Sequence, residues 1–150
     1  MPSPRAPHPL PPIDSPDEVE AQFYEALRDA DIVRLMALWS DDDDIVCVHP
    51  GGQRLVGPAA IRTSFEAIFE RGGIPVQHDR VHRARSGDAA LHSVVETVSM
   101  TEGDGQREGH VLALNVYFKT ASGWRLVAHH ASPGTPQEPS DRADARTTLH

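Results

Sequence analysis

The sequence is poor in cysteine, lysine and aromatic residues. Cys47 is the single cysteine of the 150 residues, which excludes an intramolecular disulfide framework and favours a reducing compartment, so we expect a cytoplasmic protein. Lys119 is the single lysine, and the formal net charge is −8. Nucleic acids and anionic membranes are bound by clustered basic residues, and the arginines here are dispersed. We therefore expect neither partner.

The chain also lacks an uninterrupted apolar run of the roughly 20 residues that a membrane span needs. Its first residues have no continuous apolar segment typical of a signal peptide. Residues 1–14 are rich in proline and residues 133–150 are polar, and neither segment can bury enough apolar surface to offset the cost of ordering it. The sequence predicts one folded domain over 15–132 between two flexible tails.

Helical periodicity dominates the first half of this domain. Ser15 and Glu18 form a capping box that predicts a helix over 16–29, and Asp31 begins a second helix over 32–39. A third helix starts at Pro58 and stops at the glycines 72–73. Its apolar face carries four residues: Ile61, Phe65, Ile68 and Phe69.

Strand patterns dominate the second half. A short β-rich run at 45–49 ends at Pro50, and from residue 75 the apolar period falls towards two. Glycine-containing turns separate four predicted strands, which cover 76–85, 89–101, 108–120 and 124–131. Short connections imply antiparallel neighbours. The prediction is an α+β domain in which helices close over a strongly bent antiparallel sheet and leave an internal pocket.

Nine histidines in an acidic chain raise the question of a metal site. No HExxH motif is present, and a second cysteine for a zinc site is missing. His78 and His82 would lie about 13 Å apart along a strand. The acidic run 41–44 lacks the alternating spacing of a calcium loop, so a solvated turn is favoured. We predict no metal and, without a G-x-G-x-x-G or P-loop motif, no nucleotide cofactor.

Four polar residues interrupt otherwise apolar strands: His49, Glu96, Asn115 and His130. Burying a polar group without a partner costs about 1–3 kcal/mol, so each must face solvent, find an internal partner or line a pocket. For a single residue the first two alternatives are favoured. In a fold with a concave sheet, the four residues taken together favour a shared pocket as much as they favour the other two alternatives.

The segments 23–27, 46–52 and 124–132 (FYEAL, VCVHPGG and WRLVAHHAS) resemble the SnoaL-like branch of the nuclear transport factor 2 superfamily, which includes ketosteroid isomerases. The resemblance covers nearly the whole of 15–132. It implies a cone-shaped domain with a deep pocket. It also implies a homodimer formed through the outer sheet face, where we expect Tyr117 and Arg125.

The resemblance also implies catalytic positions. His49, before Pro50, stands where the isomerases carry an aspartate base, and Asn115 stands where they carry a protonated aspartate. His49 would then be the base and Asn115 the hydrogen-bond donor, with Glu96 or His130 orienting them. The isomerases' first-helix tyrosine falls at Phe23, which cannot donate, and this argues against steroid isomerisation. Tyr24 is the next residue, and its side chain is expected about 100° around the helix axis from that of Phe23.

Three functions remain open at this point. The first is an isomerase, cyclase or dehydratase acting on a small apolar carbonyl compound held by aromatic walls, namely Phe23, Trp39, Phe65 and Phe69. The second is a non-catalytic ligand-binding domain with the same pocket. The third is an oligomerisation module resembling the association domain of calcium/calmodulin-dependent kinases. Which of His129 and His130 faces the pocket depends on a strand register that the sequence leaves open.

Overall fold

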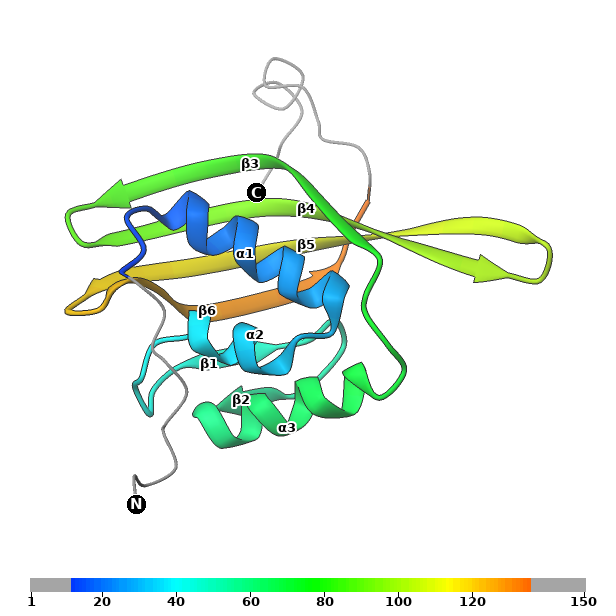
Figure 1. Cartoon of the computed structure of the whole chain (residues 1–150). Helices are drawn as coiled ribbons and strands as arrows, with labels where there is room; N and C mark the ends of the chain where they lie inside the picture. Colours follow the sequence, from blue (N-terminus) through cyan, green and yellow to red (C-terminus); the bar gives the residue numbers. More distant parts are fainter. Residues whose placement is uncertain (1–11, 136–150) are drawn as a thin grey trace, which may run out of the picture.

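The computed structural model describes residues 12–135, and most of the predicted tails, residues 1–11 and 136–150, lie outside this range. Three helices pack on a six-stranded sheet (Figure 1). The helices are α1 (Pro16–Asp29), α2 (Ile32–Leu38) and α3 (Pro58–Phe69). The strands are β1 (Val46–Val48), β2 (Arg54–Val56), β3 (Val76–Ser86), β4 (Ala89–Glu102), β5 (Gly105–Thr120) and β6 (Gly123–Pro133). The predicted α+β architecture, shaped as a cone, is confirmed.

Local hydrogen bonds explain where the first two helices begin and end. The Ser15 side chain accepts from the Glu18 N–H at 3.1 Å and caps α1. Ala30 ends α1 in the left-handed region with φ of 52°, and Asp31 caps α2 by accepting from the Arg34 N–H. All three predicted helices are present, and the bounds of α1 and α2 agree with prediction to within one residue.

The sheet has the strand order β2-β1-β6-β5-β4-β3. The predicted meander β3 to β6 is antiparallel throughout, but β1 pairs in parallel with β6, so the sheet is mixed. β2 was not expected, because three residues are too few to show a period. Register shifts interrupt the β3–β4 and β5–β6 pairs, and such bulges bend a sheet. The β4–β5 hairpin projects beyond the other strands (Figure 1).

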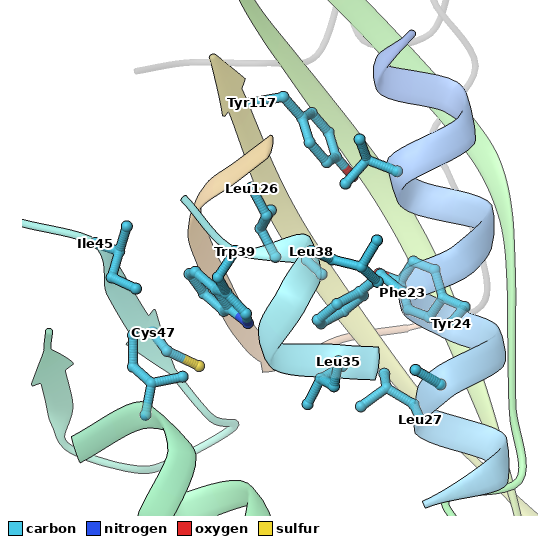
Figure 2. Packing of buried hydrophobic residues seen from close by; sticks show 14 of the residues in the cluster. Phe23, Tyr24, Leu27, Leu35, Leu38, Trp39, Ile45, Cys47, Tyr117 and Leu126 are labelled. Atoms are coloured by element: carbon cyan, nitrogen blue, oxygen red, sulfur yellow. The ribbon is translucent and has the colours of Figure 1, made fainter. Parts of the chain in front are cut away.

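The core lies between the inner sheet face and the helices. Figure 2 shows Phe23, Leu35 and Leu126 meeting there from α1, α2 and β6. Ile13 is also buried and forms a parallel bridge with Gly123, so the packed core begins before the predicted boundary at residue 15. The backbone at Gly123, with φ of 94°, approaches Ile13 so closely that a Cβ there would lie 2.5 Å from its nitrogen.

Cys47 behaves as the small buried hydrophobe that the sequence predicts. It is free and fully buried, and burial raises the pKa of its thiol to about 12. No helix in the described part of the chain is long and apolar enough to cross a membrane. A cytoplasmic location stays a prediction.

Candidate functional site

A network of buried polar side chains lies between α1 and the inner sheet face, and Glu20 is at one end of it. Tyr117 donates to Glu20 Oε2 at 2.6 Å, and Asn115 Nδ2 donates to the same oxygen at 3.2 Å. His92 Nδ1 lies 3.1 Å from it, an ion-pair distance without the alignment of a hydrogen bond. Burial alone would raise the pKa of Glu20, but these contacts outweigh it and the pKa is lowered.

Glu96 is at the other end of the network. Tyr24, one turn along α1 from Glu20, donates its hydroxyl hydrogen to Glu96 Oε2 at 2.6 Å and accepts from Asn115 Nδ2 at 3.1 Å. Burial raises the pKa of Glu96 to about 7, with a further increase from the charge of Glu20 and an opposing effect from the Tyr24 hydrogen bond. His78 faces Glu96 across the β3–β4 pair, and its ring stacks on Tyr24 at 4.3 Å.

Asn115 joins the two ends through its amide, and His129 holds it in place. The Nδ1 atom of His129 is 2.5 Å from Asn115 Oδ1, which can only accept, so this nitrogen carries the hydrogen. Burial lowers the pKa of His129 to about 3, and the imidazole is therefore neutral. The β5–β6 register pairs Asn115 with His129, and His130 points to the exposed side. The expectation of an inward His130 is wrong, and His129 takes that place.

His49 lies half-buried just beyond the end of β1. Its Nε2 atom is 3.0 Å from Ser64 Oγ, and the Ser64 hydroxyl donates to the Ile61 carbonyl at 2.8 Å. Because that hydroxyl has a single hydrogen, Ser64 accepts from His49 Nε2–H, and Nδ1 is left as the basic nitrogen. Burial lowers the pKa of His49, so the ring is neutral at neutral pH.

The predicted aromatic walls form a connected row from β1 to the network. Phe65 packs edge-on against His49 at 4.9 Å, and Phe23 lies 6.5 Å from Phe65 and 5.2 Å from His129. Phe69 extends the row at 6.0 Å from Phe65. The structure therefore brings six predicted residues into one region: His49, Glu96, Asn115, Phe23, Phe65 and Phe69.

Trp39, also predicted as a wall, has a buried Nε1 atom with no acceptor in the described part of the chain. Figure 2 shows this nitrogen on the edge of the ring turned away from Ile45. A buried indole N–H normally finds a partner. The Trp39 indole N–H is therefore a buried donor without an acceptor in the described part of the chain.

Sequence reasoning missed Glu20, Tyr24, His92 and Tyr117 as members of the network. A signal for Glu20 exists, because it lies beside Val19 and one turn from Phe23 on the buried face of α1. Tyr117 is two residues from Asn115 in a strand, so both side chains share a face. The expectation that Tyr117 lies on the outer face is wrong, since it is fully buried against Glu20.

A pocket of about 870 Å³ lies away from this network. It lies between α2, the start of α3 and the β5–β6 turn, and Trp39 is the one predicted site residue among those lining it. Arg125, expected at an outer dimer interface, is 6% exposed and also lines this pocket. Within residues 12–135 no group of three or more His, Cys, Asp or Glu side chains is placed to hold a metal ion.

A cone of three helices on a bent mixed sheet, with polar groups buried at its inner face, defines the class of fold. Residues 17–136 match the SnoaL-like domain family, and the chain belongs to that family. The relationship expected from the sequence is confirmed.

Two solved structures show the similarity in detail. A protein of Thiobacillus denitrificans named as a calcium/calmodulin-dependent protein kinase type II association domain is 34% identical, with a TM-score of 0.76, over 84% of this chain and all of that one. A protein of Streptomyces avermitilis named as a dehydratase of the nuclear-transport-factor-2-like family is 30% identical, with a TM-score of 0.69, over 79% of this chain and 93% of that one.

Among curated proteins, F-box protein SKIP8 of Arabidopsis thaliana is 26% identical over 115 residues. The match covers 76% of this chain but 47% of the plant protein, so the chain spans about half the length of that relative.

Proposed function

We propose that this chain binds a small carbonyl compound and removes and returns a proton on it, with Glu96 as the proton-transfer group. Isomerisation and dehydration of carbonyl compounds share one step, the removal of hydrogen from the carbon next to the carbonyl. The observation that carries the proposal is the buried Glu96 carboxyl, hydrogen-bonded to Tyr24. One of the similar structures is named as a dehydratase, which agrees with this reaction class.

The protonation state of Glu96 suits that step. A pKa of about 7 leaves the carboxyl divided between its two forms near neutral pH. It can therefore take a proton from carbon and give it back, which is the condition for efficient general acid–base catalysis. Isomerisation returns the proton to a different carbon, and dehydration delivers it to the departing hydroxyl group.

Asn115 takes a different role from the one that the resemblance implied. Its amide hydrogens are directed at Glu20 and Tyr24, and its oxygen is bonded to His129. We assign it as a positioning residue that holds the Tyr24 hydroxyl against Glu96. His49 is the second base in this proposal, because its Nδ1 lone pair is free and its ring is partly exposed.

The apolar body of the substrate would lie against the aromatic row formed by Phe23, Phe65 and Phe69. The Trp39 indole N–H would donate to a substrate oxygen and so gain the acceptor that it lacks. His49, Phe69 and His78 are partly exposed members of this region, so they mark the side from which a ligand would enter.

Hydrogen–deuterium exchange next to the carbonyl of cyclohexanone, followed by NMR, tests the proposal without knowledge of the natural substrate. We expect Glu96→Gln to slow the protein-catalysed exchange by about 10²–10⁴-fold, the usual contribution of a positioned acid or base. Glu66→Gln, an exposed glutamate on α3, is the matched control and should keep the wild-type rate. Equal rates in wild type and Glu96→Gln would refute the role, and a loss confined to His49→Gln would move it to His49.

We also propose that the chain forms a homodimer through the outer sheet face. Three large apolar side chains of β5 are exposed there, Leu112 by 45%, Leu114 by 39% and Phe118 by 48%. They alternate with the buried residues of the same strand and so share one face. Contiguous exposed apolar surface marks an interaction site in soluble proteins, and a similar structure carries the name of an association domain.

A further inference from the structure

The pocket between α2, α3 and the β5–β6 turn is a second place where a ligand fits. Its volume of about 870 Å³ lies within the range of small-molecule sites, roughly 300–1,000 Å³. Met36, Ala37 and Pro58 give it an apolar wall. No residue of the network around Asn115 lines it, and Trp39 is the one residue that it shares with the proposed proton-transfer site.

Arg125 gives this pocket a buried positive charge. The residue is 6% exposed, and one guanidinium nitrogen donates to the Trp124 carbonyl at 2.8 Å. No carboxylate in the described part of the chain forms an ion pair with Arg125. Burial lowers its pKa, the direction expected for a cation taken out of water. Buried guanidinium groups are normally paired with an anion, and the remaining donors of Arg125 lack one.

The start of α3 adds a second source of positive potential. Gly57 provides no side-chain cap, so the first N–H groups of this twelve-residue helix have no side-chain acceptor from that position. Pro58 and Ala59, in the first turn, line the pocket. Unsatisfied N–H groups and the helix dipole both favour an anion here. Arg62 lines the pocket too, although its ion pair with Glu66 at 3.3 Å offsets part of its charge.

Two carboxylates limit how much negative charge the pocket accepts. Asp41 and Asp42 line it and are exposed, and Asp42 accepts from the Asp44 N–H at 2.8 Å. Their charge would repel a phosphate or dicarboxylate more strongly than a single carboxylate. From this arrangement we infer that the pocket binds a small organic monocarboxylate, with its carboxylate on Arg125 and its apolar body against Met36 and Pro58.

Titration of the full chain with benzoate, followed by amide NMR, tests this inference. Benzamide is the matched probe, with the same ring and no charge. We expect benzoate to give saturable shifts at Ala59, Arg62 and the 120–122 turn, with an affinity at least about tenfold above that of benzamide. Equal affinities, no saturable shift with benzoate, or shifts centred on Tyr24 and His129 would each overturn the inference. Tighter binding of inorganic phosphate would overturn it as well.

Charge-removing variants sharpen the test. Arg125→Gln should lower the affinity for benzoate at least about tenfold. Arg62→Gln should lower it less, because Glu66 already offsets the charge of Arg62. Arg83→Gln removes an exposed charge on β3, outside the pocket, and should bind benzoate as wild type does. An equal loss in Arg83→Gln and Arg125→Gln would contradict a specific contact. If Arg125→Gln fails to fold, Arg125→Lys and Arg62→Gln carry the comparison.

Discussion

At several positions, the two faces of strands β4 and β5 reverse the usual distribution of polar and apolar groups. Glu96 and Asn115 point inward and are buried, whereas Leu112 and Leu114 point outward and are exposed. The inner polar groups are tolerated because they bond to one another and to α1. The outer apolar groups have no such cover within the described chain. The inner face therefore suits chemistry and the outer face suits association.

The strongest test of the inner face removes the acceptor at one end of the network. Glu20→Ala leaves Tyr117, Asn115 and His92 without their shared oxygen, and we expect the free energy of unfolding to fall by about 3–5 kcal/mol. Urea denaturation measures it. Glu25→Ala, on the exposed side of the same helix, should change stability little, since its ion pair with Arg34 is at the surface. Similar losses of unfolding free energy in the two variants would show that the buried network stabilises the fold no more than a surface ion pair does.

The pH dependence of stability tests the buried carboxyl of Glu96. Its pKa is raised from 4.5 to about 7, so the folded protein keeps a proton that the unfolded chain releases. This contribution is complete below pH 4.5 and is lost as the pH rises to about 7, a change of about 3 kcal/mol. The measurement is the difference in unfolding free energy between wild type and Glu96→Gln across this range.

The unfolding free energy of wild type must be compared with that of Glu96→Gln, because the titration of His129 changes stability in the opposite direction. Its pKa is lowered from 6.5 to about 3, so its contribution to stability grows as the pH rises through that window. The two slopes oppose each other between pH 4.5 and 6.5 in wild type. Subtraction removes the His129 effect, which both proteins share. A difference that stays constant with pH would mean that Glu96 ionises normally.

A substitution on the outer face should have the smallest effect on stability of these variants, but a clear effect on assembly. Leu114→Glu places a charge on the exposed apolar surface, and we expect the proposed dimer to dissociate while monomer stability changes by at most about 0.5 kcal/mol. Analytical ultracentrifugation over a range of protein concentrations measures the mass of the assembly. Val33→Glu, at a 57% exposed position on α2, is the control and should remain dimeric. A monomeric wild type, or an unchanged mass in Leu114→Glu, would refute the interface.

Much of the fold was predictable because it is encoded locally. The capping box at Ser15 and the helical stripe that includes Phe23 predicted α1, and the glycine turns predicted the meander. The family was also recognisable, because its motifs follow the order of these elements. Among the site residues, Asn115 and Glu96 stood out as polar positions in apolar strands, and the structure joins them through Tyr24.

The rest depended on register and on contacts between distant segments. A shift of one residue exchanges the faces of a strand, and only the pairing of Asn115 with His129 turned His129 inward and His130 outward. Tyr24 and Glu96 are 72 residues apart, so no local pattern relates them. The sequence by itself determined the helices, most of the strands and the family. Tertiary packing decided which polar groups meet, because pKa values and hydrogen-bond partners depend on three-dimensional distance and burial.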